Sequence, residues 1–125
     1  MVNIAINGFG RIGRLVFRMG FKENGLNFVA INDLTDSKTL AHLLKRDSVH
    51  GTFESEVEYG SDYIKVDGKK VAILAEKDLA KLPWKALNID IVVESTGKFT
   101  KEEELEQHIK SGAKKVLLSA PGKGG

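Results

Sequence analysis

The sequence predicts an α/β fold in which apolar strands of a parallel sheet alternate with helices. The first observation is a run of small and β-branched residues over positions 2–6, which suits a strand buried on both faces. The second is a glycine turn directly after this run, followed by a helical pattern. The third is the recurrence of similar apolar runs at 28–32, 89–94 and 115–119. Parallel strands connected by helices are expected to have right-handed crossovers.

The glycine turn has the spacing G-x-G-x-x-G, formed by Gly8, Gly10 and Gly13. The first glycine permits the turn, the second lets a pyrophosphate approach the backbone, and the third lets helix and strand pack closely. Asp33 lies twenty positions beyond Gly13, at the end of the next apolar run, where a carboxylate can accept hydrogen bonds from an adenosine ribose. The combination predicts a Rossmann-type dinucleotide site, and an ordinary turn after a strand is the alternative explanation of Asp33.

Two helices are expected in the first half of the chain. The first is predicted from about Arg11 to Glu23, and Asp36 or Ser37 is expected to cap the second. The first helix has Leu15, Val16, Met19 and Gly20 at helical spacing, with Phe17 and Phe21 as an apolar pair on its flank, and the second has Leu40, Leu43 and Leu44 on one face.

The middle of the chain is predicted to add antiparallel strands before the third parallel strand. Residues 52–57 alternate in character and predict one strand, and two further strands at 63–66 and 70–74 flank Asp67-Gly68, a hairpin signal. Asp78 is expected to cap a short turn before residues 82–84.

A strongly charged helix is predicted over 101–111, between the last two strands. Thr100 and Glu103 have the spacing of a capping box at its start, and Gly112 is its stop signal. Its expected inward stripe is Leu105, His108 and Ile109.

Composition excludes several classes of function. The chain has 125 residues, net charge +2 with both signs interspersed, and no cysteine. We therefore expect no disulfide and no nucleic-acid or membrane partner, and a cytoplasmic location is the default. Together with the glycine turn, the length indicates one NAD(P)-binding Rossmann domain over 1–125. No metal site is expected, and His42, His50 and His108 are interpreted as structural.

A ligand is expected at the carboxyl ends of the strands, near the switch point between the first and fourth parallel strands. The residues at those ends are the polar or glycine positions of otherwise apolar segments. They are Asn7 to Ile12, Asn32-Asp33, Ser95-Thr96-Gly97 and Ser119-Ala120.

These segments resemble the N-terminal NAD-binding half of the phosphorylating glyceraldehyde-3-phosphate dehydrogenases. The resemblance covers nearly the whole chain in the order of the family. It is carried by INGFGRIGR (6–14), AIND (30–33), DSVHGTF (47–53), LPW (82–84), DIVVESTGKFT (90–100) and SAPGK (119–123).

The resemblance implies a role for each residue of the expected cleft. Backbone N–H groups of Phe9, Gly10, Arg11 and Ile12 would line the pyrophosphate, with the Ile12 side chain near the nicotinamide. Asn7 would fix the turn, and Asp33 would hold the ribose. Lys77, where the family often has arginine, would lie beside the adenine. Ser95, Thr96, Gly97 and Phe99 would close over the adenine and ribose side, and Ser119 would contact the nicotinamide end.

Other interpretations of these residues are open. Ser95 and Thr96 could simply end a strand, and Phe99 could be a core residue. Ser119 could be a turn residue before a proline, and Arg11 a solvated charge of the first helical turn.

The choice between the two nicotinamide cofactors follows from charge. A carboxylate at Asp33 accepts hydrogen bonds from a free 2′-hydroxyl and repels a 2′-phosphate. No arginine lies within 34–41 to bind that phosphate, and only Lys38 is near. The sequence therefore favours NAD over NADP.

The resemblance also implies what this chain lacks. In the family a cysteine thiolate attacks the aldehyde, a histidine acts as base, hydride passes to the nicotinamide and phosphate releases the acyl group. Both residues come later than position 125 in the family, so we expect a truncated, inactive cofactor domain whose longer parent acts on a small-molecule substrate as a homotetramer. The alternatives are an erythrose-4-phosphate dehydrogenase domain and a non-catalytic NAD-binding module.

Overall fold

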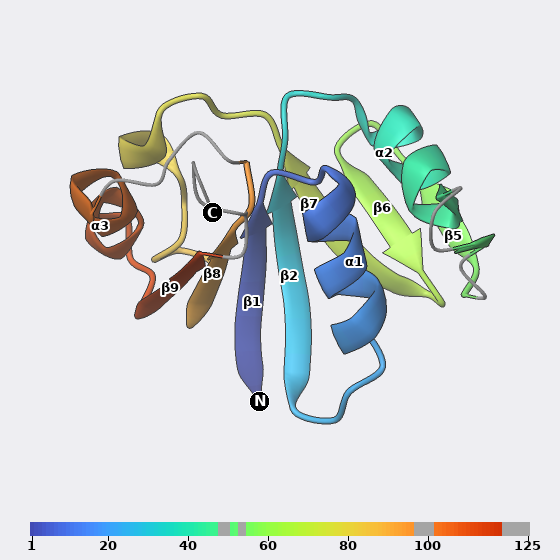
Figure 1. The fold of residues 1–125 in the computed structure, drawn as a ribbon, viewed down its shortest axis with the longest axis horizontal. Helices are drawn as coiled ribbons and strands as arrows, with labels where there is room; N and C mark the ends of the chain where they lie inside the picture. The colour runs from blue at the N-terminus through green and yellow to red at the C-terminus, as the bar shows by residue number, and fades with distance from the viewer. Residues whose placement is uncertain (48–50, 53–54, 97–101, 119–125) are drawn as a thin grey trace.

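The computed structural model describes residues 1–47, 51–52, 55–96 and 102–118. Its main sheet has seven strands in the order β5-β6-β7-β2-β1-β8-β9 (Figure 1). The strand bounds are β1 (Val2–Asn7), β2 (Leu26–Asn32), β5 (Val57–Tyr59), β6 (Tyr63–Val66), β7 (Lys69–Leu74), β8 (Ile91–Glu94) and β9 (Lys115–Leu118). The helices are α1 (Arg11–Gly20), α2 (Ser37–Lys45), α3 (Glu102–Lys110) and the 3-10 helix η1 (Leu79–Lys81).

The parallel part of the sheet has a switch point at β1. This strand pairs in parallel with β2 on one side and with β8 on the other. In chain order the sheet first grows through β2 to β7, then restarts beside β1 and grows through β8 to β9. This topology confirms the predicted Rossmann-type, doubly wound α/β fold, and it leaves the carboxyl ends of β1, β2 and β8 side by side.

The hairpin signal at Asp67-Gly68 is confirmed. Both residues have positive φ, 49° and 82°, as the turn that matches strand twist requires, and β6 and β7 pair antiparallel around them. The second arm of the hairpin has a further role that the sequence did not indicate. Strand β7 is itself the parallel neighbour of β2, so the hairpin joins the antiparallel edge to the parallel sheet.

The prediction of a single strand over 52–57 is wrong. Gly51–Thr52 forms β4, which pairs with β3 (Arg46–Asp47) in a separate two-stranded sheet, whereas β5 begins at Val57 and pairs with β6. Glu56 lies between them, and its backbone N–H donates to the Asp67 carboxylate at 2.8 Å. Alternation in sequence cannot show that two halves of a segment have different partners.

Each face of the sheet has its own hydrophobic core. On one face, strand residues such as Ile6 and Val93 pack with Phe17 of α1 and Leu40 of α2. On the other face, η1, Trp84 and Ala113 pack against small strand residues. Helices α1 and α2 thus lie on one side of the sheet, and α3 packs beside η1 and β9 (Figure 1).

Helix α1 packs differently from the sequence expectation. It ends at Gly20 rather than Glu23, and the inward residue is Phe17, whose ring lies 5.0 Å from that of Phe28 and 5.8 Å from that of Phe9. Met19 is 70% exposed. In α3, His108 is fully buried but Ile109 is 43% exposed, so only part of its predicted stripe faces inward.

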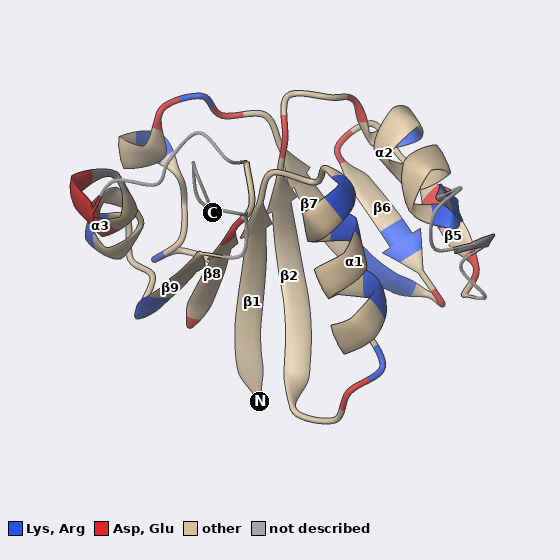
Figure 2. Cartoon of the chain, in the orientation of Figure 1, with Lys and Arg blue, Asp and Glu red and all other residues tan. Residues whose placement is uncertain are grey.

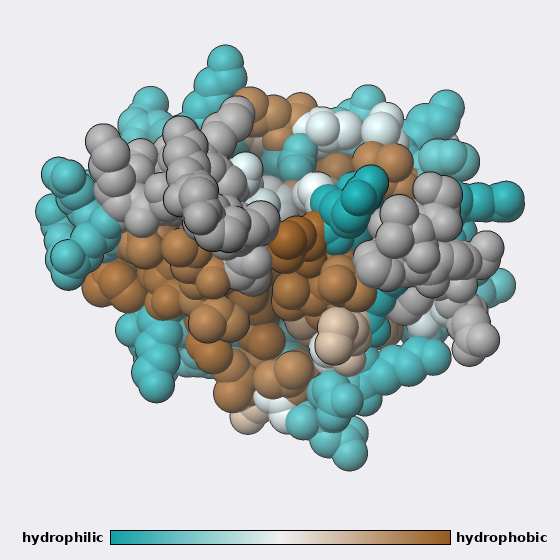
Figure 3. All heavy atoms as spheres, viewed as in Figure 1, coloured by the Kyte–Doolittle hydropathy of each residue, from teal (hydrophilic) through white to brown (hydrophobic). Residues whose placement is uncertain are grey.

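Within the described part of the chain, no helix covers part of the sheet face beside α1. Figure 3 shows hydrophobic residues gathered over the region of β1, β8 and β9. Leu117, which is paired with Val93 and shares its face, is 57% exposed. Among the residues that the structure describes, no helix combines the length and the apolar character that a bilayer span requires.

Candidate dinucleotide-binding site

A cleft of about 610 Å³ lies where β1, β2 and β8 end. This volume is typical of small-molecule sites. The sequence-predicted residues that line it are Asn7, Gly8, Gly10, Asn32, Asp33, Lys77, Ser95 and Thr96. Leu34 and Glu76 also line it, and the sequence analysis assigned neither a role.

The other candidate residues have different places. Phe9 and Gly13 are buried behind the cleft, Arg11 is exposed and Ile12 is half-buried in the first turn of α1. Gly97, Phe99 and Ser119 lie outside the described residues, as does Thr100, the expected cap of α3. Within the described ranges no group of acidic, histidine or cysteine side chains could hold a metal ion.

The glycine turn is held from both sides. Gly8 has φ +94°, its N–H donates to the Asn32 carbonyl at 2.8 Å, and its carbonyl accepts the Ser95 hydroxyl at 2.7 Å. A Cβ at Gly8 would lie 2.6 Å from Thr96 Cγ2, so only glycine lets the turn close on Thr96. The Ser95 hydroxyl is therefore directed at the turn.

Gly10 and Gly13 differ in their surroundings. A Cβ built on Gly13 would lie 2.3 Å from the Gly8 carbonyl oxygen, whereas one on Gly10 would have no heavy atom of the described residues within 4 Å. Gly13 thus allows the helix to approach the turn and the strand, and Gly10 leaves open space at the N-terminal end of α1.

The start of α1 provides an environment for an anion. Gly10 is the N-cap, no side chain in the described ranges caps the helix, and its first turn contains no acidic residue. The charged residues of α1 are all arginines, Arg11, Arg14 and Arg18 (Figure 2). An uncapped helix start next to a cleft offers unsatisfied N–H groups and the positive end of the helix dipole, which together favour a phosphate group.

Asp33 holds the turn as well as facing the cleft. Its Oδ2 accepts a hydrogen bond from the Phe9 backbone N–H at 2.7 Å, and its Oδ1 accepts one from Thr35 at 2.9 Å. Asp33 thus occupies the Phe9 N–H, one of the donors expected to line a pyrophosphate. Each carboxylate oxygen retains a second lone pair that could accept a ribose hydroxyl.

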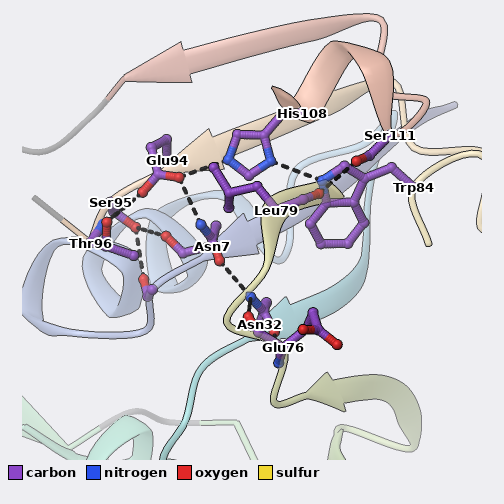
Figure 4. Close-up of polar contacts among 11 residues, drawn as sticks. Asn7, Asn32, Glu76, Leu79, Trp84, Glu94, Ser95, Thr96, His108 and Ser111 are labelled. Carbon is purple, nitrogen blue, oxygen red and sulfur yellow. Dashed lines mark hydrogen bonds and ion pairs between the residues drawn. The ribbon is translucent and has the colours of Figure 1, made fainter. Parts of the chain in front are cut away.

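Two asparagines connect the strand ends (Figure 4). The Asn32 amide pairs with the backbone of Glu76, donating to its carbonyl at 2.9 Å and accepting from its N–H at 2.9 Å. Asn32 also donates to Asn7 Oδ1 at 2.7 Å. These bonds fix the loop that carries Lys77 relative to the glycine turn.

Behind the cleft the network ends in a buried carboxylate. Glu94 is fully buried and accepts from Asn7, His108 and Thr96. Burial raises the pKa of this carboxyl, but the hydrogen bonds from His108, Asn7 and Thr96 outweigh burial, so the pKa lies below its ordinary value. Sequence reasoning placed His108 on an inward face but gave it no partner, and it missed Glu94, although an acidic residue ending the apolar run Ile91–Glu94 was a signal.

A comparison with known protein families shows the family to which the chain belongs. The family model described as "Glyceraldehyde 3-phosphate dehydrogenase, NAD binding domain" matches residues 2–102. The chain belongs to this family. The sequence-based expectation of an NAD-binding domain of glyceraldehyde-3-phosphate dehydrogenase is thereby confirmed, and with it the expectation of NAD as cofactor.

Curated relatives are glyceraldehyde-3-phosphate dehydrogenases from several bacteria. The protein from Thermotoga maritima is 56% identical over 99% of this chain, that from Bacillus cereus 54% over 97%, and that from Geobacillus stearothermophilus 53% over 98%. The chain spans 38%, 36% and 36% of the lengths of these three relatives.

Proposed function

We propose that NAD binds along this cleft. The pyrophosphate would lie at the start of α1, beside Gly10, and the adenosine ribose would lie at Asp33. Lys77 would lie beside the adenine, and Ser95 and Thr96 would form the wall opposite Asp33. The observation that carries the proposal is the uncapped, arginine-rich start of α1 opening into the cleft that Asp33 lines.

The sequence-based assignments outside the described residues are part of the same proposal. Gly97 and Phe99 would extend the Thr96 wall, and Ser119 would contact the nicotinamide end. The Ile12 side chain would lie near the nicotinamide, and the N–H groups of Arg11 and Ile12, in the first turn of α1, would donate to the pyrophosphate.

For the longer parent protein, we propose NAD-dependent phosphorylating oxidation of glyceraldehyde 3-phosphate. The names of the relatives favour this substrate over erythrose 4-phosphate. Tetrameric assembly, a cytoplasmic location and a single domain over 1–125 belong to the same proposal. Within these 125 residues the chain supplies binding and orientation of the cofactor, because it contains no cysteine to act as the nucleophile.

The purified chain is expected to give no NADH from glyceraldehyde 3-phosphate, NAD and phosphate. The reason is chemical: without a thiolate, no covalent adduct forms from which hydride can leave. The absorbance of NADH would be followed with the full-length Thermotoga maritima relative as positive control. Turnover that co-purifies with this chain through successive columns would contradict the expectation.

The cofactor assignment predicts that the chain binds NAD at least about tenfold more tightly than NADP, a difference of about 1.4 kcal/mol. The Asp33 carboxylate would accept from the 2′-hydroxyl of NAD and repel the 2′-phosphate of NADP. Calorimetric titration of both cofactors tests this. Asp33→Asn should lower the ratio of NAD affinity to NADP affinity, because it removes the negative charge that repels the 2′-phosphate and keeps the shape of the side chain.

Asp62→Asn is the matched control for this titration. Asp62 is exposed and precedes β6, away from the cleft-lining residues, so the substitution removes one negative charge without touching the cleft. The ratio of NAD to NADP affinity should stay unchanged. Equal affinities in the wild-type chain would contradict the role given to Asp33, and absence of NAD binding would contradict the proposed function itself.

A further inference from the structure

The buried carboxylate of Glu94 contacts Asn7, Thr96 and His108 (Figure 4). Its Oε1 accepts from Asn7 Nδ2 at 2.7 Å and from His108 Nε2 at 2.8 Å. Its Oε2 accepts from the Thr96 backbone N–H at 3.1 Å and from the Thr96 hydroxyl at 2.7 Å. Glu94 is not itself among the residues that line the cleft.

The donor and acceptor roles on the His108 side are fixed by an indole. The Trp84 Nε1–H can only donate, and it lies 3.0 Å from His108 Nδ1, so that ring nitrogen accepts. The proton of a neutral imidazole is then on Nε2, which donates to Glu94. All three side chains are completely buried, so no solvent competes for these bonds.

The roles on the Asn7 side are fixed by main chain. The N–H and carbonyl of Glu76 orient the Asn32 amide, and Asn32 Nδ2 then donates to Asn7 Oδ1. Asn7 is left with its Nδ2 directed at Glu94. Two chains of hydrogen bonds that start at groups of invariant polarity therefore converge on the same oxygen of Glu94, and both require it to accept.

Glu94 holds Asn7 and Thr96, which lie on the two sides of the glycine turn. Asn7 directly precedes Gly8, and Thr96 packs against Gly8 from the end of β8. Burying an anion is costly, and an apolar side chain of similar size could fill the space without that cost. What the carboxylate adds is a fixed orientation of Asn7 and Thr96 relative to each other.

We propose that Glu94 is a positioning residue for the cofactor cleft. As an anion it fixes Asn7 and Thr96 on either side of Gly8, and neutral His108 supports it from α3. The cleft is then formed before the cofactor arrives, so that binding does not have to order it. This role rests on the proposed binding of NAD in the same cleft.

The test is Glu94→Gln, which keeps the shape and one carbonyl oxygen but places an NH2 group against the Thr96 N–H. We expect NAD affinity to fall about tenfold, as loss of a hydrogen bond to a charged group implies. Glu106→Gln, the same change at an exposed position of α3, should leave affinity within about twofold. Unchanged NAD affinity in Glu94→Gln would overturn the proposal.

A second control separates positioning from loss of stability. Val71 is fully buried in β7 and does not line the cleft, so Val71→Ala weakens the core alone. Measured where both variants are fully folded, NAD affinity should fall in Glu94→Gln and not in Val71→Ala. An equal fall in the two variants would show that Glu94 acts only through stability.

Two measurements on the wild-type chain test the same proposal without NAD. Nitrogen chemical shifts should show neutral His108 with its proton on Nε2, and the Thr96 amide should exchange with solvent as slowly as the buried amides of β8. The opposite tautomer or a rapidly exchanging Thr96 amide would overturn the positioning role, even if Glu94→Gln does not fold. If these signatures are present and NAD does not bind, the proposed function fails and the network stands.

Discussion

Gly13→Ala is expected to lower the free energy of unfolding by about 2–4 kcal/mol. The added Cβ would lie 2.3 Å from the Gly8 carbonyl oxygen, 3.0 Å from Ser95 Oγ and 3.2 Å from Ile6 Cγ2. The carbonyl cannot easily move away, because it accepts the Ser95 hydroxyl and belongs to a residue with positive φ. Urea unfolding followed by Trp84 fluorescence, the only tryptophan, measures the change.

Gly10→Ala is the matched control for Gly13→Ala. Its Cβ would meet no atom of the described residues within 4 Å, and its φ of −76° with ψ of −160° is open to alanine. Stability should fall by about 1 kcal/mol at most, since alanine is a poorer N-cap than glycine. NAD affinity should fall, because the methyl group would project toward the proposed pyrophosphate. Equal losses of stability in the two variants would contradict this account of the turn.

His108→Leu is expected to lower the free energy of unfolding at pH 7 by about 3 kcal/mol or more. The substitution roughly preserves volume but leaves the Glu94 carboxylate without one donor and the Trp84 N–H without its acceptor, both in a fully buried place. His42→Leu makes the same change on the exposed side of α2 and should cost about 0.5 kcal/mol at most.

The same variant should change how stability depends on pH. The pKa of Glu94 lies below its ordinary value of 4.5, so its stabilisation is complete above that pH and is lost as the pH falls through the lower folded value. Leucine at 108 removes a hydrogen bond that lowers this pKa, so the folded value rises toward the unfolded value and less stability should be lost on acidification. Unfolding measured between about pH 3 and pH 7 tests this. Identical pH dependence in wild type and variant would contradict it.

Other carboxyls also contribute to the loss of stability at low pH, but they do not affect the comparison between the wild-type chain and His108→Leu. Backbone hydrogen bonds from Thr39, Glu56 and Asn3 lower the pKa of Asp36, Asp67 and Asp90 respectively. The hydrogen bonds of these three carboxyls do not involve His108. Each carboxyl should therefore titrate alike in the wild-type chain and in His108→Leu. The difference between the two curves therefore reports on the Glu94–His108 pair.

Local patterns were enough to predict the central part of the fold. The run at 2–6 is β1, the glycine turn follows it, and Asp33 comes directly after β2, because each depends on residues near one another in sequence. The inward face of α1 was less clear, since apolar residues surround much of the helix and periodicity alone cannot select Phe17 over Met19. Only the packing of Phe9 and Phe28 against α1 makes that selection.

The parts of the site that the sequence did not predict depend on contacts between distant segments. The bond between Asp33 and the Phe9 N–H requires the ends of β1 and β2 to meet in a particular register. Likewise, His108 reaches Glu94 only because α3 packs against η1 and brings it next to Trp84. A histidine at a helical core position gives no sign of its partner, whereas an acid that closes an apolar strand was a signal of a buried anion that the sequence analysis did not use.

In the proposed complex, NAD lies between the start of α1, Asp33 and Thr96. This position of NAD is tested most directly by titrating the 15N-labelled chain with NAD and following the backbone amide resonances. We predict that the largest shifts occur at Gly8, Gly10, Asp33 and Thr96, with the hairpin of β5 and β6 unaffected. Saturable shifts concentrated on that hairpin, or no shifts at millimolar NAD, would contradict binding of NAD in this cleft.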